Sequence, residues 1–189
     1  MQTRTEKGGK NSEGPIGTGL VIERRFTTIG EDPFDQFDWI EMDVEIRNAD
    51  GSLAHRIDDV RLPSGFSGVA GKVLAQKYLR KAGVPAILRK VKEKGVPTWL
   101  QRSEPDHEKL QSLDPEKRFI GESHGRELFR RLAGTWTYWG WKHGYFEAEA
   151  DARAYFDEMC YLIASQRSAP NSPQSVSYTH LRAHETNVD

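Results

Sequence analysis

The sequence has a single cysteine, Cys160, among its 189 residues, which excludes a disulfide framework and any zinc site built from several cysteines. No stretch approaches the roughly 20 apolar residues of a membrane-spanning helix, and the mean hydropathy is −0.70. A surplus of positive charge is also missing, since 27 Lys and Arg stand against 28 Asp and Glu. Dedicated nucleic-acid binders are usually clearly basic. These absences leave a polar globular domain with no membrane span and no direct nucleic-acid binding.

Both ends of the chain differ from its middle. Residues 1–17 are rich in Lys, Gly, Ser and Glu, and predict a disordered leader without a secretory signal, so we expect a cytoplasmic protein. From Ser175 the chain resembles the translation of a transposase sequencing adapter, which residues 176–186 follow in one reading frame. We therefore expect 175–189 to be a foreign, unstructured tail, and we discount the metal-like spacing of His180 and His184 within it.

The pattern of residues 18–174 predicts an α+β fold that begins with a small antiparallel sheet. Residues 37–47 alternate strictly between apolar and charged side chains, which is typical of a half-buried strand. Asp50-Gly51 favours a tight turn, and Leu53–Leu62 should return as the partner strand, giving a hairpin across 38–62. Leu20–Phe26 is predicted as a third strand.

Helices are predicted after the hairpin. Ser67 caps a helix over 67–82, with Ala70, Val73, Leu74 and Tyr78 on its apolar stripe. Residues 84–123 contain four prolines and predict an extended surface connection, with short helices around Ile87–Lys94. Two long helices over 125–142 and 149–167 then form an antiparallel pair. Their apolar stripes are Leu128, Leu132, Trp136 and Trp139 on the first, and Ala152, Phe156, Met159 and Ile163 on the second.

Several motifs are weak candidates for chemistry. Gly65–Lys72 fails as a phosphate-binding loop, because Phe66 and Val73 stand where that motif needs Gly and Ser or Thr. The Trp-rich segment 135–146 offers rings on which bases could stack, but its helical spacing favours core packing. Cys160 on a helix indicates a structural thiol. The histidines show no metal-ligand spacing, so neither a metal site nor a catalytic residue is predicted.

Asn171-Ser172-Pro173 is a more informative corner. Pro173 disfavours the helical conformation at Ser172, so the last helix must end before it. A serine hydroxyl and free N–H groups at such a turn can donate to an anion.

Longer blocks carry a resemblance to a known family. They are Ala133–Lys142, Gly144–Phe146, Gln166-Arg-Ser-Ala-Pro-Asn-Ser-Pro-Gln174, Ile22–Thr27, Ile46–Asn48 with Asp50-Gly51, and Leu74–Tyr78 running to Gly83-Val-Pro85. In this order they resemble the N-terminal region of the adenosylcobalamin-dependent (class II, vitamin B12-dependent) ribonucleotide reductases, from about residue 18 to 174.

The resemblance implies an oxidoreductase that reduces ribonucleotides to deoxyribonucleotides for DNA synthesis. In this family the N-terminal region precedes a ten-stranded α/β barrel. Adenosylcobalamin generates a thiyl radical on a barrel cysteine, the radical removes the ribose 3′ hydrogen, and a cysteine pair supplies electrons. The implied partners are a ribonucleotide substrate such as a ribonucleoside diphosphate, a nucleotide effector and a second subunit of a homodimer.

The resemblance also implies what this chain lacks. After Gln174 the family continues into the first barrel strand, whereas here the adapter-like string begins, so we expect an inactive fragment. Cys160 matches none of the family's catalytic cysteines. One functional position falls inside the chain: Ser172 matches the serine that contacts the substrate phosphate. The rival interpretation is an autonomous helical module that binds protein or nucleic acid through residues 135–146.

Overall fold

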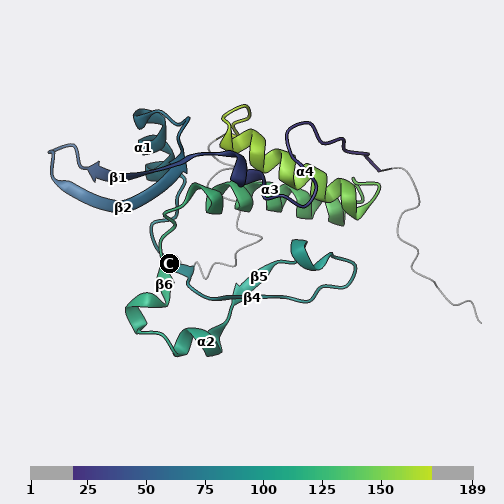
Figure 1. Cartoon of the computed structure of the whole chain (residues 1–189). Helices are drawn as coiled ribbons and strands as arrows, with labels where there is room; N and C mark the ends of the chain where they lie inside the picture. Colours follow the sequence, from purple (N-terminus) through teal and green to yellow (C-terminus); the bar gives the residue numbers. More distant parts are fainter. Residues whose placement is uncertain (1–18, 172–189) are drawn as a thin grey trace, which may run out of the picture.

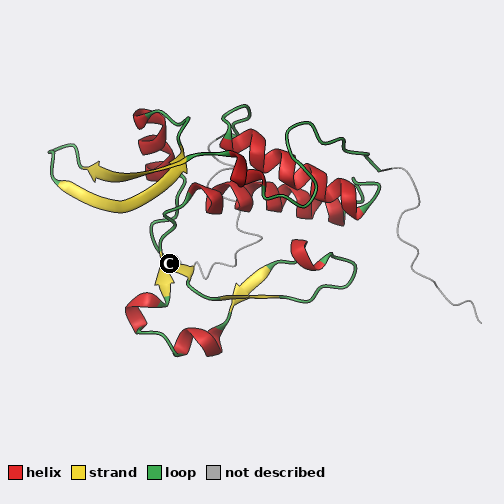
Figure 2. Cartoon of the chain, viewed as in Figure 1, coloured by secondary structure: helices red, strands yellow, loops and turns green. Residues whose placement is uncertain are grey.

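The computed structural model describes residues 19–171. The predicted leader, Ser172 and the tail 175–189 lie outside the described residues. Figure 1 shows the hairpin and the long helices in its upper part, and a smaller lobe of short elements below them. Figure 2 shows how much of the lobe is loop. The α+β class predicted from the sequence is confirmed.

The hairpin is present as predicted. Strands β1 (Trp39–Arg47) and β2 (Leu53–Pro63) pair antiparallel, from Trp39 opposite Pro63 to Arg47 opposite Leu53. At the turn, the Gly51 N–H donates to the Asn48 carbonyl at 2.9 Å, and Gly51 has a φ of +84°, which glycine adopts without a steric cost. Val44, Val60 and Leu62 are fully buried on the inner face.

The third strand predicted at Leu20–Phe26 is wrong. Leu20 forms an isolated parallel bridge with Phe146, and the residues after it run along the last helix without strand structure. Carboxylates satisfy several N–H groups of this segment, as when the Ile22 N–H donates to Asp151 Oδ1 at 2.9 Å. Because carboxylates accept from these backbone N–H groups, the segment does not need a neighbouring strand to form its hydrogen bonds.

Helix α1 (Gly68–Lys77) begins as predicted but ends five residues earlier than residue 82. The Ser67 hydroxyl caps it by accepting from the Ala70 N–H at 3.1 Å. Its buried face is Gly71, Leu74 and Ala75, whereas Val73, predicted on the stripe, is exposed. Val73 is exposed because the helix turns the face with Gly71 toward the sheet. An added Cβ at Gly71 would lie only 2.9 Å from Met42 Sδ. The helix therefore packs closest to the sheet at its glycine.

Residues 84–120 are not the extended connection that the sequence predicted; we name them the lobe. Strand β4 (Leu88–Lys90) occupies the region where short helices were predicted, because it pairs with β5 (Ser103–Pro105) across a loop that contains η2 (Thr98–Leu100). Val84, Val96, Leu100 and Leu110 give the lobe buried side chains of its own. Its other elements are β3 (Val84–Pro85), which pairs with β6 (Phe119–Ile120), α2 (His107–Gln111) and η3 (Pro115–Lys117).

The two long helices are present as α3 (Gly125–Lys142) and α4 (Glu149–Ala164), which lie side by side in Figure 1. Helix α4 ends three residues before the predicted residue 167. Gly144, with a φ of +67°, follows α3 in the turn that reverses the chain. The short η1 (Pro33–Gln36) packs Phe34 against them. Of the helices between residues 19 and 171, none combines the length and apolar character that crossing a bilayer demands. The main core lies between the hairpin, α1 and this pair. It includes Phe34, Leu62, Phe66, Leu74, Phe129 and Leu132.

Candidate functional site

Ser172 follows directly on Asn171, the last described residue, so the structure shows how the chain approaches it. Helix α4 ends at Ala164, and the next residues close over its end. The Gln166 N–H donates to the Ile163 carbonyl at 3.1 Å, and the Arg167 and Ser168 N–H groups donate to the Leu162 carbonyl at 2.9 and 3.1 Å. The chain therefore leaves the helix through a hydrogen-bonded corner before it reaches Ser172.

Arg167 anchors this corner on the N-terminal segment. Its guanidinium carbon lies 4.8 Å from the ring centroid of Phe26 and 6.0 Å from that of Tyr161. The two rings stack on each other, with centroids 5.1 Å apart and planes at 5°. A guanidinium over an aromatic face is attracted by the ring quadrupole. The Phe26 ring thus joins the segment before the hairpin to the segment that leads to Ser172.

The N-terminal segment is itself held by Glu158 of α4. One carboxylate oxygen of Glu158 accepts from the N–H groups of Arg25, Phe26 and Thr27 at 3.1, 3.1 and 2.9 Å, and from the Thr27 hydroxyl at 2.7 Å. Burial alone would raise the pKa of Glu158, but these four hydrogen bonds together lower it below the ordinary value. Glu158 is therefore the acceptor that fixes Phe26 in place.

A second buried carboxylate, Glu122, lies where the chain returns from the lobe to α3. It accepts from the Arg80 N–H at 3.0 Å and from Arg131 Nη2 at 3.1 Å. The side chains of Arg131 and Glu122 are 1% and 0% exposed. Arg131 also donates to the Tyr78 carbonyl at 3.0 Å. This ion pair ties both ends of the lobe to the helix pair.

The larger cavity, about 1010 Å³, lies between the lobe, residues 30–33 and the two long helices. Its arginines are matched by carboxylates: Arg130 contacts Asp32, Arg153 lies 3.1 Å from Asp157, and Arg126 lies 3.5 Å from Asp35. Lys90 donates to the Gln101 carbonyl at 2.7 Å, and burial lowers the pKa of its amine. Because these three arginines are already paired with carboxylates, the cavity does not offer them as unpaired cations to an anionic ligand.

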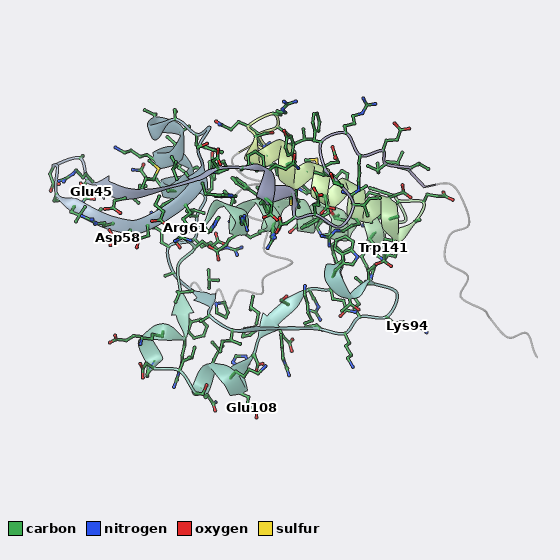
Figure 3. All side chains as sticks on the ribbon, viewed as in Figure 1. Glu45, Asp58, Arg61, Lys94, Glu108 and Trp141 are labelled. Carbon is green, nitrogen blue, oxygen red and sulfur yellow. The ribbon has the colours of Figure 1, made fainter. Side chains whose placement is uncertain are left out.

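The Trp-rich segment packs mostly against the rest of the molecule, as its spacing predicted, although Trp136, Trp139 and Trp141 are only partly buried. Trp136 contacts the main core, while Trp139 and Trp141 pack against Val96, Leu100 and Tyr138. Trp141 Nε1 donates to the Gly95 carbonyl at 2.6 Å, at the contact between the end of α3 and the lobe that Figure 3 labels. Trp139 and Trp141 thus help to hold the lobe, while Trp136 and Trp139 also line a second cavity, of about 640 Å³. These contacts favour packing over the rival binding module.

Cys160 is fully buried in the main core, and burial raises the pKa of its thiol well above the ordinary value. We expect Cys160 to resist thiol-modifying reagents in the folded protein and to react once urea unfolds it, since the thiolate is the reactive form. Mass spectrometry after timed alkylation measures this. Stoichiometric labelling under native conditions would contradict the structural role.

No group of three or more His, Cys, Asp or Glu between residues 19 and 171 is placed to hold a metal ion. The buried charges at 122, 131 and 158 were missed by the sequence analysis. Arg131 and Glu158 lie among the buried residues of α3 and α4, so a charged residue on the inward face of a predicted helix was the sign that could have indicated them. A charged side chain is rarely buried unless it is paired, so each marks a hydrogen-bonded contact between elements.

Comparison with known proteins identifies the family. A family model described as class II vitamin B12-dependent ribonucleotide reductase matches residues 41–166. The chain is 52% identical over 155 residues to the vitamin B12-dependent ribonucleotide reductase of Bradyrhizobium diazoefficiens, and 50% identical over 155 residues to that of Agrobacterium fabrum. Each match covers 82% of this chain and 12% of the relative, so the chain spans about an eighth of those proteins. The chain belongs to the class II vitamin B12-dependent ribonucleotide reductase family, of which it represents the N-terminal region.

Proposed function

We propose that this chain is part of an enzyme that reduces ribonucleotides to deoxyribonucleotides, and that it contributes the serine that binds the substrate phosphate. The observation that carries the first part of the proposal is the sequence match across residues 41–166. That match ends before Ser172, whose role is inferred from the resemblance of the block Gln166–Gln174 to the family. The natural unit would be residues 18–174, with residues 1–17 as a leader and 175–189 as a foreign tail. A nucleotide effector, a homodimer and a cytoplasmic location complete the proposal.

The vitamin B12 dependence of the family implies adenosylcobalamin, which supplies radical initiation when bound. The described residues do not fit this large cofactor. The larger cavity is lined by arginines already matched with carboxylates, and the smaller one, about 640 Å³, has the size of a site for a single small ligand. We propose that the cofactor binds elsewhere in the complete enzyme. The chain alone is then expected to be inactive.

Ser172 would act on a part of the substrate that does not react. Its hydroxyl would donate to a phosphate oxygen, and such a charge-assisted hydrogen bond contributes about 1.5–3 kcal/mol. A phosphate held at one point fixes where the ribose lies. The role of this residue is therefore to bind and orient the substrate.

The test is Ser172→Ala in a full-length reductase that carries this segment. We expect kcat/KM for a ribonucleotide to fall roughly 10- to 150-fold, mostly through a higher KM, because the lost bond serves substrate and transition state alike. Ser112→Ala is the matched control, since this exposed lobe hydroxyl donates to the Lys109 carbonyl within its own helix. Unchanged kinetics for Ser172→Ala would remove this residue from the site.

A further inference from the structure

The smaller cavity, of about 640 Å³, is walled mainly by aromatic rings. It lies between the N-terminal segment, the end of α3, the turn that follows and the first half of α4. Its rings include Trp136, Trp139, Tyr145, Phe146 and Tyr155, and Leu20 adds aliphatic surface. Among residues 19–171, no Asp, Glu, Lys or Arg lines this cavity, whereas the larger cavity is lined by several of each sign.

The walls of the smaller cavity are held by contacts between separate segments. The Leu20 N–H donates to the Tyr145 carbonyl at 2.7 Å, which fixes the N-terminal segment beside the turn after α3. On α3, Gly140 leaves room for the ring of Phe146, because a Cβ there would lie 2.7 Å from Cε2 of that ring. Phe146 in turn packs on Tyr155 of α4, with ring centroids 5.4 Å apart. The cavity is therefore a hollow with positioned walls.

The rim of this cavity exposes apolar surface to water. Leu20 and Tyr145 line the cavity and are 61% and 59% exposed, and the neighbouring Val21 is 72% exposed. Exposed apolar side chains elsewhere, such as Ile29 and Val69, lie on other segments and line neither of the two cavities. A hollow bordered by contiguous apolar surface is typical of a site where another group binds.

The chemistry of the lining restricts what can enter. A charged group would lose its hydration there without gaining a counter-charge from the described lining, which is unfavourable. Aromatic side chains gain most, because rings pack edge to face or offset on one another in addition to burying area. The occupant should therefore be uncharged, apolar and preferably aromatic.

The length of the relatives indicates where such a group comes from. The chain covers 12% of each of the two relatives described above, so about seven-eighths of a complete reductase lies outside it. Surface that the complete enzyme covers is exposed in this chain. An uncovered apolar hollow is then expected wherever the remaining part packs.

We propose that the smaller cavity is a docking site for apolar side chains, above all aromatic ones, from the remainder of the reductase. Leu20, Val21 and Tyr145 form the rim of this docking site, and Trp136 and Phe146 belong to its wall. The inference rests on the proposed function in one respect, that the chain is part of a longer enzyme. It involves neither substrate nor Ser172.

The first test compares access to position 145 in this chain and in a full-length reductase that carries the segment. In Tyr145→Cys we expect the new thiol to react readily with iodoacetamide in the chain and at least about tenfold more slowly in the reductase, because a covered thiol is shielded from the reagent. Ile29→Cys is the matched control, since Ile29 is 81% exposed and lines neither cavity, so its rate should be similar in both proteins. Mass spectrometry of the labelled peptides gives each rate separately from that of Cys160.

The second test places a charge on the rim. Leu20→Asp should leave the melting temperature of the chain within about 2 °C, as is usual for an exposed position. The same substitution should lower the melting temperature of the full-length reductase, because the carboxylate would be buried against apolar side chains. Ile29→Asp is the control and should change neither protein.

Equal alkylation rates at position 145 in the chain and in the reductase would overturn the docking site. Slow alkylation in the chain itself would overturn it too: with a doubled mass in sedimentation a second copy fills the cavity, and with a single mass another part of this chain does. Protection that dialysis of the reductase removes would assign the cavity to a small molecule and overturn docking as well. Ribonucleotide reduction by a reductase in which position 145 is accessible refutes docking and leaves the proposed function standing. A protected position 145 in a full-length protein that reduces no ribonucleotide would do the reverse.

Discussion

Glu122→Ala is expected to lower the free energy of unfolding by about 3–5 kcal/mol, the usual cost of removing one partner of a buried ion pair. The Arg131 guanidinium is 1% exposed and loses its carboxylate in this variant. The Arg80 N–H loses its acceptor as well. Water can reach the Arg131 guanidinium in place of the lost carboxylate only if the lobe separates from α3. The lobe should therefore loosen together with the global loss of stability.

Urea unfolding followed by circular dichroism measures this loss. Glu104→Ala is the matched control, because its ion pair with Arg89 is exposed and such pairs contribute about 0–1 kcal/mol. Replacing both partners by apolar residues, as in Glu122→Leu/Arg131→Met, should recover only part of the stability. The Arg80 guanidinium, 3.8 Å from Glu122 and 12% exposed, still loses its carboxylate. A loss below about 1 kcal/mol for Glu122→Ala would show that water reaches the pair.

Glu158→Ala is expected to have the second largest effect, a loss of about 2–4 kcal/mol, because several part-buried donors lose their acceptor at once. Three backbone N–H groups and the Thr27 hydroxyl donate to this carboxylate. Without it, residues 25–27 should detach from α4 and release the Phe26 ring from Arg167, while Arg24 stays paired with Asp157 at 2.8 Å. Glu158→Gln retains one acceptor oxygen and should lose less. Hydrogen exchange at residues 25–27 reports the detachment directly, and unchanged protection there would refute it.

The acid dependence of stability offers an independent check on Glu158. Its pKa is lowered in the folded protein, so its contribution is fully present above its unfolded value, about 4.3, and is lost as the pH falls through the lower folded value. The stability difference between the wild type and Glu158→Gln should therefore be constant near neutral pH and shrink in acid. Asp50 and Asp106 also have lowered pKa values, but both variants share them. Equal acid dependence in the two proteins would contradict this role.

The elements that the sequence predicted correctly are those with a strong local pattern. The hairpin follows from strict alternation across 40–47 and from Gly51 at the turn, and α3 and α4 follow from apolar side chains at helical spacing. These elements also make most of the main core, so the fold class could be predicted without tertiary information.

The lobe could not be predicted because its order is non-local. Its ladders are two or three residues long, too short for any alternation, and β3 pairs with β6 at the opposite end of the lobe. The face of α1 was also misjudged, because the close approach at Gly71 depends on Met42 and Leu62 of the sheet. In both cases the deciding contact lies in another segment of the chain.

The site was only partly accessible to the sequence. The assignment of Ser172 depended on family resemblance, since a serine before a proline is by itself an ordinary helix stop. Nothing in the sequence indicates that Gln166 has a positive φ, of +59°, because glutamine is a good helix former. Its side-chain amide could also donate to many different acceptors. The bond from Gln166 to Gly65 joins residues 101 apart and becomes visible only in three dimensions.

The most direct test of the account is a structure of the full-length reductase with a ribonucleotide bound. The measured quantity is the distance from the Ser172 hydroxyl oxygen to the nearest phosphate oxygen of the substrate. We expect a hydrogen bond of about 2.5–3.0 Å. A phosphate held by other groups, with Ser172 out of hydrogen-bond reach, would contradict it.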